Sequence, residues 1–208
     1  MREEANIVEQ YAGADTSGRI DILIKYYPNF LRLVEGYEQS LSYIIKQEKE
    51  YKYRTSRGDL GVRVQTSGIS DPTAREAIDN IMIMDAIRSG DLKSIIRDLD
   101  EEVMQLHETE VRTLRNMKED FSIFKNSFFY LEPESAELFE KYLMTCRRVE
   151  RLATELDIPT EALKQQVHRM KRVVVEQTSG VLNRKYQFMG GMQKCHTAEE
   201  EEVSDRST

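Results

Sequence analysis

The side chains best suited to chemistry are cations and amides gathered toward the C-terminal end of the chain. Apolar residues recur there at Leu163, Val167, Met170 and Val174, which is the spacing of one buried helix face. The opposite face is left to basic and amide side chains, and no acid occurs over residues 162–175. Lysine and arginine bond guanine or phosphate, and glutamine can bond an adenine edge with two hydrogen bonds. The pattern therefore favours nucleic-acid binding.

A shorter helix is expected just before this one. Residues 147–156 place their apolar side chains on one face, where the small Ala153 would let a following helix cross closely. Residues 157–159 form a tight connection whose Ile158 is expected in the core, and Thr160 is expected to cap the second helix. The inner face of the first helix comprises Val149, Leu152, Ala153 and Leu156.

Two helices joined by a short turn, with the second one basic, are the parts of a helix-turn-helix that reads the major groove. The expected outer surface of the second helix comprises Lys164, Gln165, His168, Arg169, Lys171 and Arg172. On the first helix, Arg147, Arg148 and Arg151 are expected to bind the phosphates of the DNA backbone. A plain helical hairpin with a solvated basic face is the alternative interpretation.

The segment RRVERLATELDIPTEALKQQVHRMKR resembles the helix-turn-helix of region 4 of bacterial sigma factors, over roughly residues 135–175. Together with the upstream YRTSRGDLGVRVQTSGISDPTAREAI, it resembles the RinA/ArpU-type late-gene regulators of phages and mobile elements. The resemblance implies promoter binding beside RNA polymerase and activation of a phage operon. No counterpart of the aromatic-rich sigma region that melts promoter DNA is present, which favours an activator. Groove-facing residues implied by the resemblance are Thr160, Glu161, Lys164, Gln165, His168 and Arg169.

The chain around this module is expected to be all-α, with an N-terminal helical, coiled-coil domain followed by the C-terminal helix-turn-helix. Glycine and proline are scarce, and long stretches are rich in Glu, Lys, Leu and Ile. We expect a flexible lead-in over 1–18, a helical domain over 19–132, the DNA-binding domain over 133–176 and a flexible acidic tail over 177–208. An ordered loop is expected over 53–71.

Four helices are expected in the N-terminal domain, and the first is a short apolar helix around Ile20–Tyr27 that ends near Pro28. One runs to about Tyr51 along a seam of Phe30, Val34, Tyr37, Leu41, Ile44 and Tyr51. A helix over about 72–88 contains four consecutive apolar residues, Ile81–Met84, and is expected to be the buried centre of the domain. A long helix over about 91–128 has near-heptad spacing, with Glu110 as its one polar seam position. Its seam comprises Leu92, Ile96, Leu99, Val103, Leu106, Leu114, Met117, Phe121, Phe124 and Phe128.

Composition and motifs narrow the function classes. The chain has 208 residues, and its net charge of −7 includes four consecutive acids at 199–202, so local charge matters more than the total. Its three histidines lie on different expected elements without ligand spacing, so we expect no metal site. No nucleophile or phosphate-cradling motif occurs, and we expect no cofactor and no enzymatic activity. The N-terminus lacks an apolar leader, and a cytoplasmic location is expected.

The expected partners are double-stranded DNA and RNA polymerase, with no membrane. The seam of the long helix can pair with the Phe30–Tyr51 seam of the same chain, which is the simpler interpretation, or with a second copy of the chain, which would make a homo-oligomer through the N-terminal helices. Two other functions stay open. A small-terminase-like DNA-packaging protein also joins a helix-turn-helix to an oligomerising coiled coil, and assembly of a ring would indicate it. A helical protein-interaction module would bind a partner without binding DNA.

Overall fold

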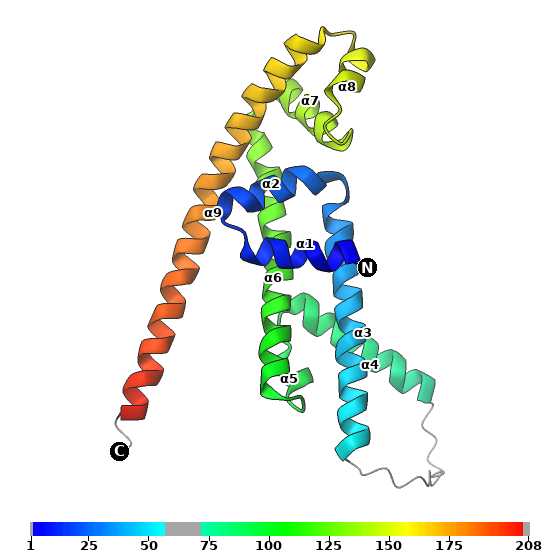
Figure 1. Ribbon diagram of the computed structural model, residues 1–208, viewed down its shortest axis with the longest axis vertical. Helices are drawn as coiled ribbons and strands as arrows, with labels where there is room; N and C mark the ends of the chain where they lie inside the picture. The colour runs from blue at the N-terminus through cyan, green and yellow to red at the C-terminus, as the bar shows by residue number, and fades with distance from the viewer. Residues whose placement is uncertain (1, 57–71, 206–208) are drawn as a thin grey trace. The chain divides into compact units, whose positions relative to one another are not determined.

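A computed structural model describes residues 2–56 and 72–205, with side chains described over 7–55 and 77–188 (Figure 1). Within these ranges every regular element is a helix, which confirms the expected all-α class. None of the described helices combines the length and the apolar composition of a membrane span. The elements are α1 (Arg2–Gly13), α2 (Thr16–Tyr26), η1 (Tyr27–Asn29), α3 (Phe30–Ser56), α4 (Pro72–Ser89), α5 (Lys93–Ile96), α6 (Glu101–Asn126), η2 (Ser127–Tyr130), α7 (Pro133–Met144), α8 (Val149–Leu156) and α9 (Thr160–Asp205).

The chain divides into two compact units, and α6 contributes to both. Unit 1 comprises residues 1–13 and 29–118, and unit 2 comprises residues 14–28 and 119–208. This division differs from the expected boundary at 132/133. Residues 14–28 and 119–132 belong with the C-terminal helices because Tyr27 packs on Phe121 and Phe124, and Phe128 packs on Phe139 of α7.

In unit 1, α1 packs on α3 and replaces part of the flexible lead-in expected over 1–18. Ile7, Val8 and Tyr11 are buried, and the Tyr11 ring lies 6.1 Å from that of Phe30. These three apolar residues share one helix face, which offsets the polar character of the rest of the segment. The rest of the expected lead-in begins α2, where the Asp15 carboxylate accepts a hydrogen bond from the N–H of Gly18.

The seams of α3 and α6 differ from the expected ones at several positions, where the neighbouring residue is buried instead. Ile45 is fully buried, whereas Ile44 is 46 % exposed. On α6, His107 is 2 % exposed, whereas Leu106 is 58 % exposed. Tyr51, the last expected seam residue of α3, is also exposed. The polar side chain of His107 is buried because carboxylates of both helices bond it, as described below.

The expectation that residues 72–88 form the buried centre of the domain is wrong. Ile83 and Ile87 are buried, but Ile78, Ile81 and Met82 on the other side of α4 are half or more exposed. Four consecutive apolar residues point around a helix in all directions, so such a run cannot by itself show that every face is covered.

The expected continuous helix over 91–128 is also interrupted. Gly90, with φ of +81°, ends α4, and the short α5 precedes a bend over 97–100 before α6 begins at Glu101. The end of the expected helix, Phe128, lies in η2. Residues 53–56, expected at the start of an ordered loop over 53–71, belong to α3, and residues 57–71 lie outside the described ranges.

Unit 2 is built around an aromatic cluster. The Tyr27 ring lies 5.5 to 6.0 Å from the rings of Phe121, Phe124 and Phe128, and Phe139 lies 5.4 Å from Phe128. This cluster joins Tyr27 of η1, the end of α6, η2 and α7 into one core. It gives α7 and α9 a rigid base, because aromatic side chains bury large areas with few rotatable bonds.

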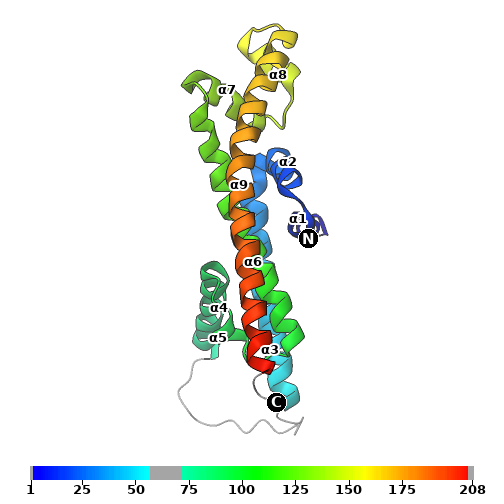
Figure 2. The same cartoon turned by 90° about the vertical axis from the view of Figure 1, so that its left-hand side faces the viewer.

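The helix α9 extends far beyond the expected limit at 176 (Figures 1 and 2). Thr178 and Leu182 are fully buried, so the flexible tail expected from 177 is wrong over the residues whose side chains are described. The buried Asp120 carboxylate accepts hydrogen bonds from Lys185 Nζ at 2.8 Å and from the Tyr186 hydroxyl at 2.5 Å. These contacts hold α9 against α6 within unit 2.

Candidate nucleic-acid interface

The connection between α7 and α8 presents two arginines to solvent. Cys146 and Arg147 both have positive φ, 55° and 64°, although neither is glycine. The N–H of Arg147 donates to the carbonyl of Tyr142 at 3.0 Å, which reverses the chain direction at the end of α7. Arg147 and Arg148 are consequently exposed just before α8 begins at Val149.

A second tight turn joins α8 to α9. Asp157 adopts the left-handed conformation, with φ of 53° and ψ of 42°. The N–H groups of Asp157 and Ile158 both donate to the carbonyl of Ala153, so the end of α8 is satisfied without glycine. Aspartate tolerates this conformation better than most residues because its side chain is short and polar. Ile158, expected in the core, is half-buried.

The expected inner stripe of α9 is confirmed. Leu163 and Val174 are fully buried, and Val167 and Met170 are each 6 % exposed. Ala153 on α8 is 3 % exposed, as expected for a small residue at a close helix crossing. Burial of this stripe determines the rotation of α9 about its axis and therefore which side chains point outward.

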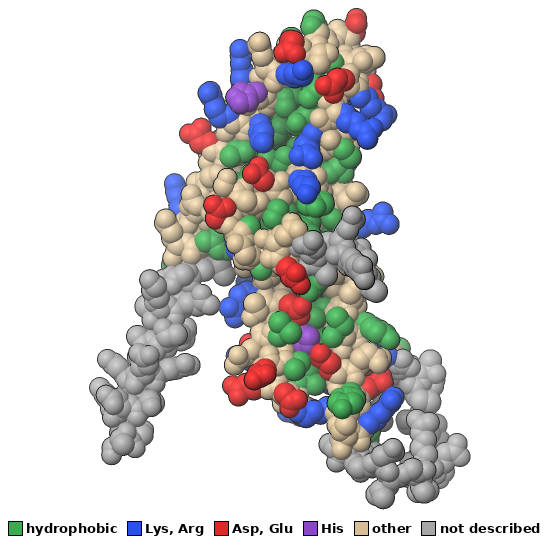
Figure 3. Space-filling view, viewed as in Figure 1, with side chains coloured by type: hydrophobic (Ala, Val, Ile, Leu, Met, Phe, Trp, Pro, Cys, Tyr) green, Lys and Arg blue, Asp and Glu red, His purple; other side chains and the backbone are tan. Residues whose placement is uncertain are grey.

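The expected outward residues of α9 lie on its solvent side. Gln165, His168, Arg169 and Arg172 are exposed, whereas Lys171 is half-buried. In the space-filling view, lysine and arginine side chains gather over the part of unit 2 formed by α7–α9, with acids among them (Figure 3).

The start of α9 differs from the expected one, in which Thr160 caps the helix. The helix begins at Thr160 itself, which is half-buried, and its side chain forms no capping hydrogen bond with a described residue. Glu161 is exposed in the first turn, where its charge suits the positive end of the helix dipole.

Two of the candidate cations are already paired. Arg151 Nε lies 3.0 Å from Glu155, and Lys164 Nζ lies 2.9 Å from Glu161. The hydrogen bond from Glu161 raises the pKa of Lys164 above its ordinary value. The candidate cations that form no ion pair with a described residue are Arg147, Arg148, Arg169, Lys171 and Arg172.

Unit 1 contains a buried polar cluster that the sequence did not reveal. His107 Nε2 lies 2.6 Å from Glu48 Oε2, and His107 Nδ1 lies 3.0 Å from Glu110 Oε2. The Tyr37 hydroxyl donates to the other Glu110 oxygen at 2.6 Å. A signal was present in the interruption of both apolar seams by a glutamate, Glu48 on α3 and Glu110 on α6, with a histidine three residues before Glu110.

The protonation of this cluster follows from its contacts. Burial lowers the pKa of His107, but hydrogen bonds to Glu110 and Glu48 outweigh it and leave that pKa raised. For Glu110, burial raises the pKa, and hydrogen bonds from His107 and Tyr37 outweigh it and leave the pKa lowered. The contacts therefore favour the protonated form of His107 and the ionised form of Glu110.

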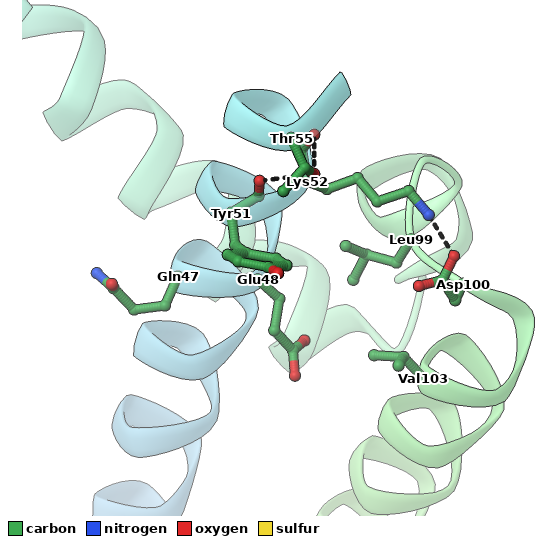
Figure 4. Close-up of a pocket in the computed structure, with 8 residues that line it drawn as sticks. All are labelled: Gln47, Glu48, Tyr51, Lys52, Thr55, Leu99, Asp100 and Val103. Carbon is green, nitrogen blue, oxygen red and sulfur yellow. Dashed lines mark hydrogen bonds and ion pairs between the residues drawn. The ribbon is translucent and has the colours of Figure 1, made fainter. Parts of the chain in front are cut away.

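A pocket of about 710 Å³ opens beside this cluster, between the end of α3 and the start of α6 (Figure 4). Tyr51, Leu99 and Val103 provide its apolar lining. Leu99, Asp100 and Val103 lie opposite the α3 residues of the pocket. The charged groups of the pocket are already paired, because Lys52 forms an ion pair with Asp100 and Glu48 bonds His107.

The sequence-predicted site residues thus come together on α8, α9 and the turn before α8, all within unit 2. The described residues contain no group of three or more histidine, cysteine, aspartate or glutamate side chains placed to hold a metal ion. Comparisons with protein-family models, with curated proteins and with solved structures found no match to this chain.

Proposed function

We propose that the protein is a sequence-specific DNA-binding transcriptional regulator, an activator of phage or mobile-element genes. One observation carries the proposal. The solvent face of α9 over residues 162–175 has no acid, and the packing of its inner stripe leaves Gln165, Arg169 and Arg172 exposed. With α8 and the turn at 157–159, these side chains support a helix-turn-helix that would insert its second helix in the major groove.

The exposed residues divide by the contacts that their chemistry allows. Gln165, His168 and Arg169 lie along the middle of the exposed face, and their side chains can hydrogen-bond base edges. Arg147 and Arg148 are placed to bind phosphates, which orient a protein on DNA without reading its sequence.

The ion pairs of the free protein indicate how strongly salt should weaken binding. Because Arg151 and Lys164 are neutralised within the protein, about five cations remain to displace counterions from the phosphates. Each neutralised phosphate contributes about −0.9 to the slope of log K against log salt concentration, so we expect a slope of about −4 to −5.

The test is a gel-shift and footprinting titration on fragments of the source genome at several salt concentrations. Gln165→Ala should cost about 1–3 kcal/mol at one base position only, whereas Arg172→Ala should weaken binding to all sequences and reduce the salt slope by about one. Arg97→Ala, an exposed cation of unit 1, is the matched control and should change neither quantity. Equal effects of all three variants, or no binding at about 50 mM salt, would refute the proposal.

Activation is a separate part of the proposal. The resemblance to sigma region 4 predicts that the bound protein increases transcription from an adjacent promoter by RNA polymerase. Transcription with purified components, from a template that carries the footprinted site, measures this directly. A decrease in transcript would identify a repressor instead, while leaving the DNA-binding proposal intact.

A further inference from the structure

Two aromatic side chains of unit 2 project into solvent at the junction between α6 and α7. Phe129 is 88 % exposed and Tyr130 is 65 % exposed, and neither forms a hydrogen bond or ring contact with a described residue. Together they leave on the order of 300 Å² of aromatic surface in water, which is the size of patch that often marks a functional surface.

This exposure is maintained by a rigid base. The preceding Phe128 is buried in the aromatic cluster, 5.4 Å from both Phe124 and Phe139. The Ser127 hydroxyl donates to the carbonyl of Phe124 at 2.6 Å and accepts from the Thr178 hydroxyl at 3.1 Å. Ser127 and Phe128 are the buried residues of η2, and the next two side chains, at the end of this short helix, remain in solvent.

The charge beside the aromatic pair is negative. Glu132, Glu134 and Glu137 are exposed at the start of α7 and form no ion pair with a described residue. No lysine or arginine occurs over residues 126–140. This sign disfavours nucleic acid at the junction, in contrast to the basic face of α9.

We propose that Phe129, Tyr130 and the three glutamates form a docking surface for a cationic amphipathic helix of a partner protein. The aromatic rings would bury against the apolar face of such a helix, and the carboxylates would pair with lysines or arginines at its edges. None of these five residues belongs to the proposed DNA-binding face, so the inference stands or falls independently of the proposed function.

The probe is a fluorescein-labelled helical peptide of leucine and lysine, about 18 residues long, titrated with the full-length protein while its fluorescence anisotropy is measured. The double variant F129S/Y130S should lower affinity at least tenfold. The triple variant E132Q/E134Q/E137Q should lower it several-fold and reduce its salt dependence. Phe188→Ser is the matched control, because Phe188 is 71 % exposed in the same unit and follows Arg184 and Lys185, and it should leave affinity unchanged.

Three outcomes would overturn the proposal. Equal affinity of all variants would mean that the peptide binds acidic surface non-specifically. Loss of DNA affinity in F129S/Y130S, in the gel-shift titration above, would assign the rings to DNA instead. Dissociation of a wild-type dimer by the same variant in sedimentation equilibrium would show that a second copy of the chain covers them.

Discussion

Replacement of His107 by leucine gives the sharpest test of the packing of unit 1, because the neighbouring residue is an internal control. The sequence pattern predicts that Leu106 is buried in the seam of α6. The structure instead buries His107 and leaves Leu106 58 % exposed. His107→Leu and Leu106→Ala therefore have opposite expected outcomes under the two interpretations.

The magnitude follows from the contacts of the imidazole. His107→Leu removes hydrogen bonds of 2.6 Å to Glu48 and 3.0 Å to Glu110, and bonds to charged groups contribute about 1.5–3 kcal/mol each. The Glu48 side chain is 35 % exposed and the Glu110 side chain 23 % exposed, so water partly replaces the lost bonds. The buried leucine recovers some hydrophobic free energy, and we expect a net loss of about 2 kcal/mol. Leu106→Ala removes an exposed side chain and should cost about 0.5 kcal/mol or less.

Urea unfolding followed by far-ultraviolet circular dichroism, at about pH 6, measures both changes. With an m value of about 1–2 kcal/mol per molar urea, His107→Leu should lower the midpoint by about 1–2 M, and Leu106→Ala should hardly move it. A larger loss for Leu106→Ala than for His107→Leu would show that the seam contains Leu106 and that the cluster does not stabilise unit 1.

Three further predictions concern pH, charge and backbone geometry. The pKa of His107 is raised above 6.5, so its stabilising contribution is complete below pH 6.5 and is lost as pH rises through the folded-state pKa. The pKa of Glu110 is lowered below 4.5, so its contribution is present above pH 4.5 and is lost as pH falls through the folded-state pKa. The midpoint of urea unfolding should therefore be highest between pH 4.5 and 6.5, and His107→Leu should reduce its decrease at higher pH. Glu161→Gln frees Lys164 and removes a negative charge beside the proposed groove face, so it should tighten DNA binding several-fold and make the salt slope steeper by about one; weaker binding would instead assign Glu161 to a DNA contact. Asp157→Val should lower the free energy of unfolding by about 1–2 kcal/mol, whereas Asp157→Gly should not destabilise, and equal thermal midpoints for the two variants would show that the left-handed turn is not formed.

The sequence by itself determined the all-helical class and the orientation of α9. Leu163, Val167, Met170 and Val174 repeat without a polar interruption, so only one rotation of the helix buries them all. The exposed basic face follows from that rotation. Local periodicity is sufficient here because the stripe is apolar and every residue between its members over 164–172 is polar.

Only the tertiary structure decided which polar residues are buried. His107 is unfavourable in a core on its own, and its burial depends on Glu48, which is 59 residues away in the sequence and becomes a neighbour only when α3 packs on α6. Asp120 is buried for the same reason, because Lys185 and Tyr186 reach it from α9.

The same dependence on contacts between distant residues explains the wrong predictions for the lead-in over 1–18, the tail from 177 and the burial of α4. Exposure of Ile81 and burial of Thr178 both depend on which other helices cover those faces, and such contacts join residues far apart in the chain. Periodicity records which residues share a helix face, but it does not record whether another helix packs against that face.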